Sequence, residues 1–197
     1  GNITAGGNNN IIGMADGIYN GGMPFTYTGL GGVTATKELT NNGTISINNN
    51  SAALYGKNNA GILNSGTIFT GKDSVVIYAN LTNDILNYGI INLGENSKGI
   101  FSKDGTYTND INTGKILSTS NSATGIYSEY NAGGSTLIRN SNEITLFGLN
   151  SIGIYVIGTG IQNIENTGII NISDSNDIND PSMGIYNENV ANTLVNS

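Results

Sequence analysis

Residues 87–101 read Asn-Tyr-Gly-Ile-Ile-Asn-Leu-Gly-Glu-Asn-Ser-Lys-Gly-Ile-Phe, and they hold one copy of each of two phrases that recur along the chain. The first phrase is Asn-x-Gly-x-Ile, and the second is Asn-Ser-x-Gly-Ile-Tyr, with Phe in place of Tyr in this copy. The phrases alternate, and each returns after very roughly two dozen residues. A repeat of this length is typical of a stacked array of coils and not of a globular domain with one closed core.

The first phrase begins at an asparagine in every copy. These asparagines are Asn41, Asn64, Asn87, Asn112, Asn140 and Asn166. In the copy that begins at Asn140, Asn142 stands where the other copies have glycine. Asparagine enters the left-handed region of the backbone more readily than most residues other than glycine. The substitution therefore predicts a turn that requires a positive φ.

The second phrase ends at an aromatic residue. The resulting column is Tyr19, Tyr55, Tyr78, Phe101, Tyr127, Tyr155 and Tyr186, and its first copy reads Ala15-Asp16-Gly17-Ile18-Tyr19. We assign the neighbouring aliphatic column, from Ile18 to Ile185, to the core. Offset ring contacts between coils stabilise such an aromatic column, and this is the role we expect. The alternative is an exposed ladder that stacks on sugar rings.

Aliphatic residues keep even offsets from each first-phrase asparagine. Four residues after it stand Ile45, Ile68, Ile91, Ile116, Ile144 and Ile170. Two residues before an asparagine stand Leu39, Ile62, Ile85, Ile138, Ile164 and Leu194. In the copy at Asn112 the pattern slips by one residue, with Ile111 directly before the asparagine. Even offsets predict strands with one buried face.

Three short strand candidates per repeat, separated by turns, predict an all-β parallel β-helix of about seven coils with three strands per coil. Helical repeats are a poor alternative, because glycine or asparagine interrupts every short stretch and glycine costs about 1 kcal/mol against alanine inside a helix. Coils about 4.8 Å apart would stack isoleucine on isoleucine. The corner asparagines would then hydrogen-bond from coil to coil through their amides.

The composition excludes several classes of function. The chain has 11% charged residues, a net charge of −7, only 7 Lys and Arg residues, and no Cys. This lack of basic residues argues against binding to nucleic acid or anionic lipid. The absence of Cys and His removes disulfides and the commonest zinc ligands, and we expect no cofactor. Low charge can indicate disorder, but regular isoleucine columns argue against it.

The alternating phrases, in an Asn-rich, Cys-free and acidic chain, resemble the passenger region of large type V autotransporter adhesins, particularly the fusobacterial ones, over roughly residues 39–196. The resemblance implies a right-handed parallel β-helix on the outer surface of a Gram-negative bacterium. It also implies a signal peptide before this segment and a membrane-embedded translocator after it. Neither end looks like the terminal cap that natural solenoids need. We therefore expect residues 1–197 to be a single β-helix segment excised from a longer passenger.

Two insertions interrupt the repeats and are the first candidates for recognition. The insertion at residues 20–36 contains Phe25 and Tyr27, which have the profile of binding anchors or, alternatively, pack on the open end of the first coil as a cap. The insertion at residues 173–181 offers a weak calcium candidate in Asp174, Asn176, Asp177 and Asp180. Its spacing departs from the EF-hand pattern, so an acidic solvated loop is the other interpretation.

We expect a non-enzymatic adhesin segment at the extracellular side of the outer membrane. As a monomer, without inserting into the membrane, it would bind a host cell-surface protein or glycan through its loops or lateral faces. One alternative is a structural spacer or stalk. The other is a polysaccharide-cleaving β-helix enzyme, for which Asp84 and Asp110 would supply a pair of carboxyl groups on successive coils.

Overall fold

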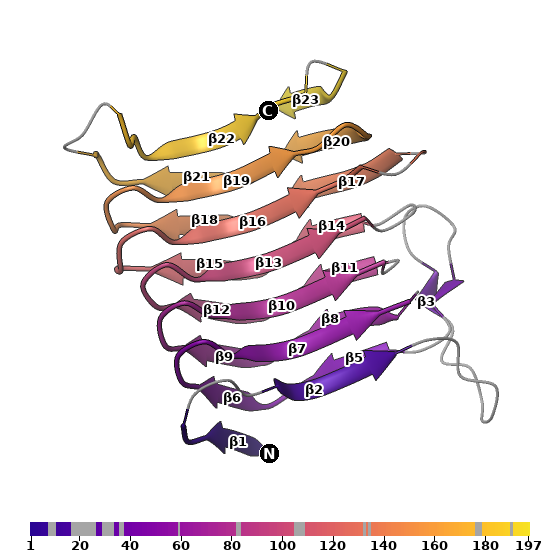
Figure 1. The fold of residues 1–197 in the computed structure, drawn as a ribbon, viewed down its shortest axis with the longest axis vertical. Coiled ribbons are helices and arrows are strands. Elements are labelled where there is room, and N and C mark those ends of the chain that lie inside the picture. The colour runs from indigo at the N-terminus through magenta and orange to yellow at the C-terminus, as the bar shows by residue number, and fades with distance from the viewer. Residues whose placement is uncertain are drawn as a thin grey trace.

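A computed structural model of the chain describes residues 1–7, 11–16, 27–28, 34–35, 38–58, 60–81, 84–104, 109–131, 133, 135–175, 179–189 and 191–197. Within these residues the regular structure is all β-strand. Three parallel sheets of seven strands each wind into a β-solenoid, in which every coil gives one strand to each sheet (Figure 1). The predicted fold class is confirmed, while its right-handedness stays a prediction.

Each sheet contains one strand from every coil, in the order of the chain. The first sheet contains β1 (Asn2–Ala5), β6 (Thr44–Ile47), β9 (Thr67–Thr70), β12 (Ile90–Leu93), β15 (Lys115–Ser118), β18 (Glu143–Leu146) and β21 (Ile169–Ile172). The second sheet contains β2 (Ile11–Asp16), β7 (Ala52–Lys57), β10 (Val75–Asn80), β13 (Lys98–Lys103), β16 (Thr124–Glu129), β19 (Ile152–Ile157) and β22 (Met183–Asn187). The third sheet contains β5 (Glu38–Asn41), β8 (Gly61–Asn64), β11 (Asp84–Asn87), β14 (Asn109–Asn112), β17 (Ser135–Asn140), β20 (Ile161–Asn166) and β23 (Thr193–Asn196).

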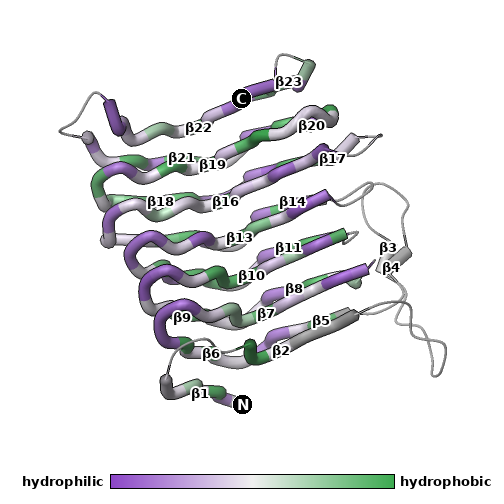
Figure 2. Tube along the Cα trace, viewed as in Figure 1, coloured by the Kyte–Doolittle hydropathy of each residue, from purple (hydrophilic) through white to green (hydrophobic). Residues whose placement is uncertain are grey.

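The core is a stack of aliphatic side chains enclosed by the three sheets. One fully buried isoleucine from each sheet illustrates it: Ile91 in β12, Ile100 in β13 and Ile85 in β11. Burial of a side chain of this size contributes about 1.5–3 kcal/mol. The turns between the first and second sheets in the lower coils are hydrophilic (Figure 2). The apolar columns predicted from the even offsets are therefore the inside of the solenoid.

The corner asparagines form the predicted ladder. Their side chains stack from coil to coil, and each Nδ2 donates to Oδ1 of the next asparagine. The series runs through Asn41, Asn64, Asn87, Asn112, Asn140, Asn166 and Asn196, at 2.8 Å for each step and 2.7 Å for the last. Most of these side chains are buried. The ladder thereby satisfies polar groups inside the corner that would otherwise destabilise the fold.

The predicted positive φ at the first phrase is wrong. Neither Gly66 nor Asn142 has a positive φ, and left-handed residues lie instead at the other two corners, as at Asn50 (53°) and Leu81 (56°). Glycine is needed for a different reason, because a Cβ on Gly66 would lie 2.0 Å from a carbonyl oxygen of the coil below. Where Asn142 replaces glycine, the backbone hydrogen bond from the N–H of Glu143 to the carbonyl oxygen of Gly114 in the coil below lengthens to 3.4 Å.

The predicted slip at Ile111 is also wrong. Asp110, not Ile111, pairs with the inward residues Ile85 and Ile138 of the adjacent coils. The coil keeps its register because Asn112 remains in the amide ladder. An aspartate therefore occupies a core position that adjacent coils fill with isoleucine.

The first coil differs from the prediction as well. Met14, not Tyr19, lies opposite Tyr55, and Gly13 takes the place expected for Ile18. β2 begins at Ile11, and its register with β7 sets these two positions. Residues 17–19 lie outside the described residues. The insertion at residues 20–36 contains an antiparallel pair, β3 (Tyr27–Thr28) with β4 (Thr34–Ala35).

Candidate binding face

The outer face of the second sheet carries a continuous aromatic ladder. Each second-sheet strand from β7 to β22 contributes one ring, at its central outward position. The rings are those of Tyr55, Tyr78, Phe101, Tyr127, Tyr155 and Tyr186. Successive ring centroids lie 5.1, 4.9, 4.8, 5.0 and 4.9 Å apart. This spacing follows the distance between neighbouring strands, about 4.8 Å. All six side chains are half-buried.

The ring orientations change along this aromatic ladder. Tyr55 and Tyr78 are stacked with an interplanar angle of 4°, whereas Tyr78 and Phe101 meet edge to face at 90°. Each such pair contributes about 0.5–1.5 kcal/mol beyond its buried area. The predicted ring contacts between coils are therefore confirmed, and the role of the column stays a prediction. Because the rings remain half-exposed, the same face also offers aromatic area to a ligand.

Burial holds the pKa of Tyr78, Tyr127 and Tyr155 above the ordinary tyrosine value. Burial raises the pKa of Tyr78, and the neighbouring Tyr55 and Glu129 add to this effect while Lys103 opposes it. Burial also lowers the pKa of Lys98, whose Nζ lies 5.6 Å from the centroid of the Tyr127 ring. A cation over a ring face is attracted to it, so Lys98 covers the Tyr127 ring.

A hollow of about 430 Å³ lies beside the lower end of the ladder. The rings of Tyr55 and Tyr78 line it together with apolar residues of the same outer face. The full lining is Ile11, Asn50, Ser51, Ala52, Tyr55, Asp73, Val75 and Tyr78. Ala52 and Val75 take the register position that Lys98 takes one coil further on. No long side chain therefore fills this position beside Tyr55 and Tyr78. Aromatic walls combined with a few polar groups are typical of ligand sites.

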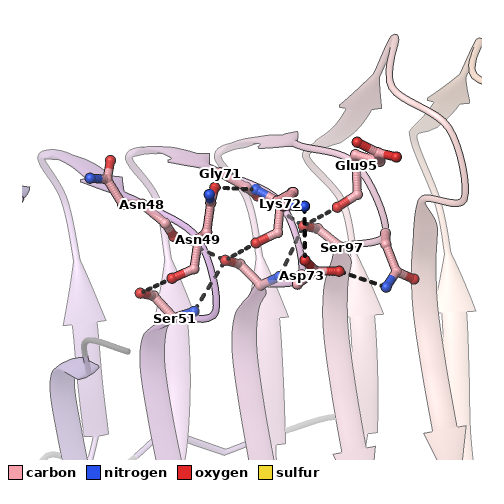
Figure 3. A network of polar contacts seen from close by, with 10 residues as sticks. Asn48, Asn49, Ser51, Gly71, Lys72, Asp73, Glu95 and Ser97 are labelled. Atoms are coloured by element: carbon pink, nitrogen blue, oxygen red, sulfur yellow. Dashed lines mark hydrogen bonds and ion pairs between the residues drawn. The ribbon is translucent and has the colours of Figure 1, made fainter. Parts of the chain in front are cut away.

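The polar edge of the hollow is held by a hydrogen-bond network at the corner between the first and second sheets (Figure 3). Asn96 Nδ2 donates to Asp73 Oδ1 at 2.8 Å. The backbone N–H of Ser51 donates to Ser74 Oγ at 3.2 Å, and Ser74 Oγ donates to the carbonyl oxygen of Lys72 at 3.0 Å. The serine contact repeats from coil to coil, since the backbone N–H of Ser74 donates to Ser97 Oγ at 3.1 Å. The Asn50 side chain makes no hydrogen bond to another described residue, which leaves its amide available.

A second hollow, of about 330 Å³, lies on the outer face of the first sheet. Leu117 and Phe147 provide its apolar lining, with Asn92 and Thr145 as polar neighbours. Phe147 is 58% exposed, and Phe69 on the same sheet is 46% exposed. This face has exposed rings but no stacked ladder among the described residues. It therefore provides a matched control surface for the face of the second sheet.

The predicted anchors of the first insertion are only partly described. Phe25 lies outside the described residues. Tyr27 belongs by its backbone to β3, where it pairs with Ala35. Their role as binding anchors, or as a cap, stays a prediction.

The calcium candidate is also incomplete, because Asn176 and Asp177 lie outside the described residues. Asp174 and Asp180 are exposed. The carbonyl oxygen of Asp180 accepts a hydrogen bond from Ser175 Oγ at 2.8 Å. Among the described residues, no group of three or more Asp and Glu side chains is placed to hold a metal ion.

Asp84 and Asp110 do not occupy equivalent positions on successive coils, contrary to the prediction. Asp84 pairs with Asn109, and Asp110 pairs with Ile85. Both carboxyl groups are buried, at 2% and 0% exposure. They line neither hollow. A polysaccharide chain on the surface of this structure would not reach Asp110.

The sequence interpretation missed the hollow because it treated the aromatic column alone. The available signal lies three residues before each ring, where the small Ala52 and Val75 are followed by Lys98 in the next coil. Among the residues that the structure describes, no helix is long and apolar enough to cross a membrane. Comparison of the chain with protein-family models, curated proteins and solved structures found no match.

Proposed function

We propose that this chain is a surface-exposed segment of an autotransporter-type adhesin that binds a host cell-surface protein or glycan through the outer face of its second sheet. The observation that carries the proposal is the half-exposed aromatic ladder, from Tyr55 to Tyr186, with the hollow beside its first two rings. Tyrosine offers a large, rigid and amphipathic contact area at a small entropic cost. Its placement on a stacked scaffold spaces the rings regularly.

Two further observations support an extracellular binding role. The alternating Asn-x-Gly-x-Ile and Asn-Ser-x-Gly-Ile-Tyr phrases resemble those of autotransporter passengers. The chain also has no cysteine and carries a net charge of −7. A strongly acidic surface favours solubility and disfavours attachment to nucleic acid or anionic lipid. The proposed location is therefore the extracellular side of a bacterial outer membrane, with the segment acting as a monomer.

A structural spacer is the competing function. The amide ladder and the ring contacts stiffen the solenoid, and a spacer needs no more than this. The two functions differ in whether the isolated segment binds anything. A polysaccharide-cleaving enzyme is disfavoured by the burial of Asp84 and Asp110.

The test is binding of the purified 197-residue chain to cultured host cells and to a glycan array. An adhesin segment gives saturable binding that is lost when the chain is heat-denatured and competed by unlabelled chain. A chain that binds neither cells nor glycans above the denatured control would make the spacer the better account. Release of reducing ends from a polysaccharide would instead support the enzyme.

A further inference from the structure

Asp110 occupies a place in the hydrophobic core where neighbouring coils have isoleucine. Its partners in the third sheet are Ile85 and Ile138, and all three side chains are 0% exposed. Transfer of a carboxylate into such an apolar environment is strongly unfavourable, whereas a neutral carboxylic acid is tolerated when it is hydrogen-bonded. The protonation state of Asp110 therefore bears directly on whether this coil is stable.

The same coil contains a second polar residue that contacts Asp110. Ser102 in β13 takes the register position of Ala79 in the coil below and of Ser128 in the coil above. Its Oγ is hydrogen-bonded to Asp110 Oδ2 and to Ser128 Oγ, the latter at 3.1 Å. Ser102 and Ser128 are buried, at 4% and 2% exposure. Three hydrogen-bonded polar side chains thus lie together inside an apolar core. We call Ser102, Asp110 and Ser128 the Asp110 cluster.

The hydrogens of the Asp110 cluster fit a neutral Asp110. A hydroxyl group has one hydrogen to donate. If Asp110 is protonated, its Oδ2 donates to Ser102, and Ser102 then donates to Ser128. Asp110 Oδ1 is buried without a hydrogen-bond partner among the described residues in either state, so an ionised Asp110 would leave a charge in the core with one of its two oxygens unpaired. The neutral form is therefore the one that the surrounding structure accommodates.

No positive charge compensates Asp110 from the described parts of the strands packed against it. On β11, Asp84 adds a second buried carboxyl group. On the other neighbouring strands the charged side chains pair with each other at the surface, Lys103 with Glu129 at 2.9 Å and Arg139 with Glu165 at 2.6 Å. Lys98 of β13 lies over the Tyr127 ring on the outer face of the second sheet.

Burial therefore raises the pKa of Asp110 from 3.8 to about 7, with the Ser102 hydrogen bond opposing and the Asp84 charge adding to the effect. The sign of the pH dependence follows from this direction. Because the folded pKa lies above the unfolded value, the stability from neutral Asp110 is fully present below about pH 4 and is lost as the pH rises through about 7.

We propose that the Asp110 cluster makes the coil of β13 and β14 a pH-sensitive weak point of the solenoid. The coil is closed while Asp110 is neutral, and it opens locally when Asp110 ionises. In a solenoid each coil contacts only its neighbours, so one coil can open without unfolding of the whole chain. Opening at β13 and β14 separates the lower coils, which carry the Tyr55–Tyr78 hollow, from the coils above.

Amide hydrogen exchange of the whole chain tests this proposal, with rates corrected for the intrinsic effect of pH. Between about pH 5 and about pH 8, the opening equilibrium of residues 98–104 and 109–112 should increase by up to about a hundredfold, given the shift of one carboxyl pKa to about 7. Residues 143–166, two coils further on, should change much less and serve as the internal control.

Two variants assign the effect to Asp110. Asp110→Asn keeps the shape of the side chain and its hydrogen bond to Ser102 but cannot ionise, so its exchange at residues 98–104 and 109–112 should be independent of pH after correction. Asp110→Ile restores the isoleucine column and should give stronger protection at both pH values. Constant opening in the unmodified chain between these pH values would overturn the proposal. So would an Asp110→Asn variant that keeps the full pH dependence.

Discussion

The side-chain amide of Asn64 donates a hydrogen bond to Oδ1 of Asn87 at 2.8 Å, inside a corner where both side chains are fully buried. The side-chain amide of Asn87 in turn donates to Oδ1 of Asn112 at 2.8 Å. A buried amide left without its partner costs about 1–3 kcal/mol. The amide ladder therefore helps to fix the register of neighbouring coils, because a coil that slipped by one residue would leave two amides unpaired.

Replacement of Asn87 by alanine should destabilise the chain by about 2–4 kcal/mol, because it removes a buried side chain and breaks two ladder steps. Urea unfolding followed by circular dichroism measures this change. Asn92→Ala is the matched control, since Asn92 lies on the outer face of β12 five residues away, and it should alter stability by less than about 0.5 kcal/mol. Equal effects of the two substitutions would show that the ladder contributes little.

Replacement of Gly89 by alanine should be costly for a steric reason. A Cβ at this position would lie 2.0 Å from the carbonyl oxygen of Gly66 in the coil below. The backbone must shift to admit it, and overpacking of this kind costs about 1–3 kcal/mol. Gly184→Ala is the control, because a Cβ there meets no atom within 4 Å. A thermal melt in which Gly89→Ala is as stable as Gly184→Ala would contradict the close approach of the coils.

Adjacent residues of β12 should respond in opposite ways to a charge. Ile91 is 0% exposed, whereas Ile90 is 39% exposed on the outer face. Ile91→Asp should unfold the neighbouring coils, because an unpaired buried carboxylate costs several kcal/mol. Ile90→Asp should change stability by less than about 0.5 kcal/mol. Limited proteolysis distinguishes the two variants, and the reverse order of sensitivity would mean that the strand faces are assigned the wrong way round.

The parts of the fold that follow from the sequence are those in which every coil repeats the same local chemistry. Asn87 and Ile91 recur with like residues at fixed offsets, and stacking forces such residues onto each other. The aromatic column from Tyr55 to Tyr186 could be predicted for the same reason.

The errors arise where a local preference competes with the register. Ile111 is apolar, so the pattern predicts a slip that turns it inward, but the amide of Asn112 holds the coil so that Asp110 takes the inward position. Tyr19 completes a good copy of the second phrase, yet β2 begins at Ile11 and its register with β7 brings Met14 opposite Tyr55. The hollow beside Tyr55 and Tyr78 depends on the small side chains of Ala52 and Val75. These two residues belong to neither repeated phrase in a fixed way, so the repeats do not predict the hollow.

The most direct measurement of the proposed binding face compares the affinity of matched variants for the cells or glycan that the unmodified chain binds. Tyr55→Ala combined with Tyr78→Ala removes the wall of the hollow, and Phe69→Ala combined with Phe147→Ala removes two exposed rings from the first sheet. We predict that the tyrosine pair weakens binding by at least about tenfold, or 1.4 kcal/mol, in a chain that still shows a cooperative melt, while the phenylalanine pair leaves the affinity unchanged. Unchanged affinity in the tyrosine variant, with loss of binding in Phe25→Ala combined with Tyr27→Ala, would contradict this account and place recognition in the first insertion.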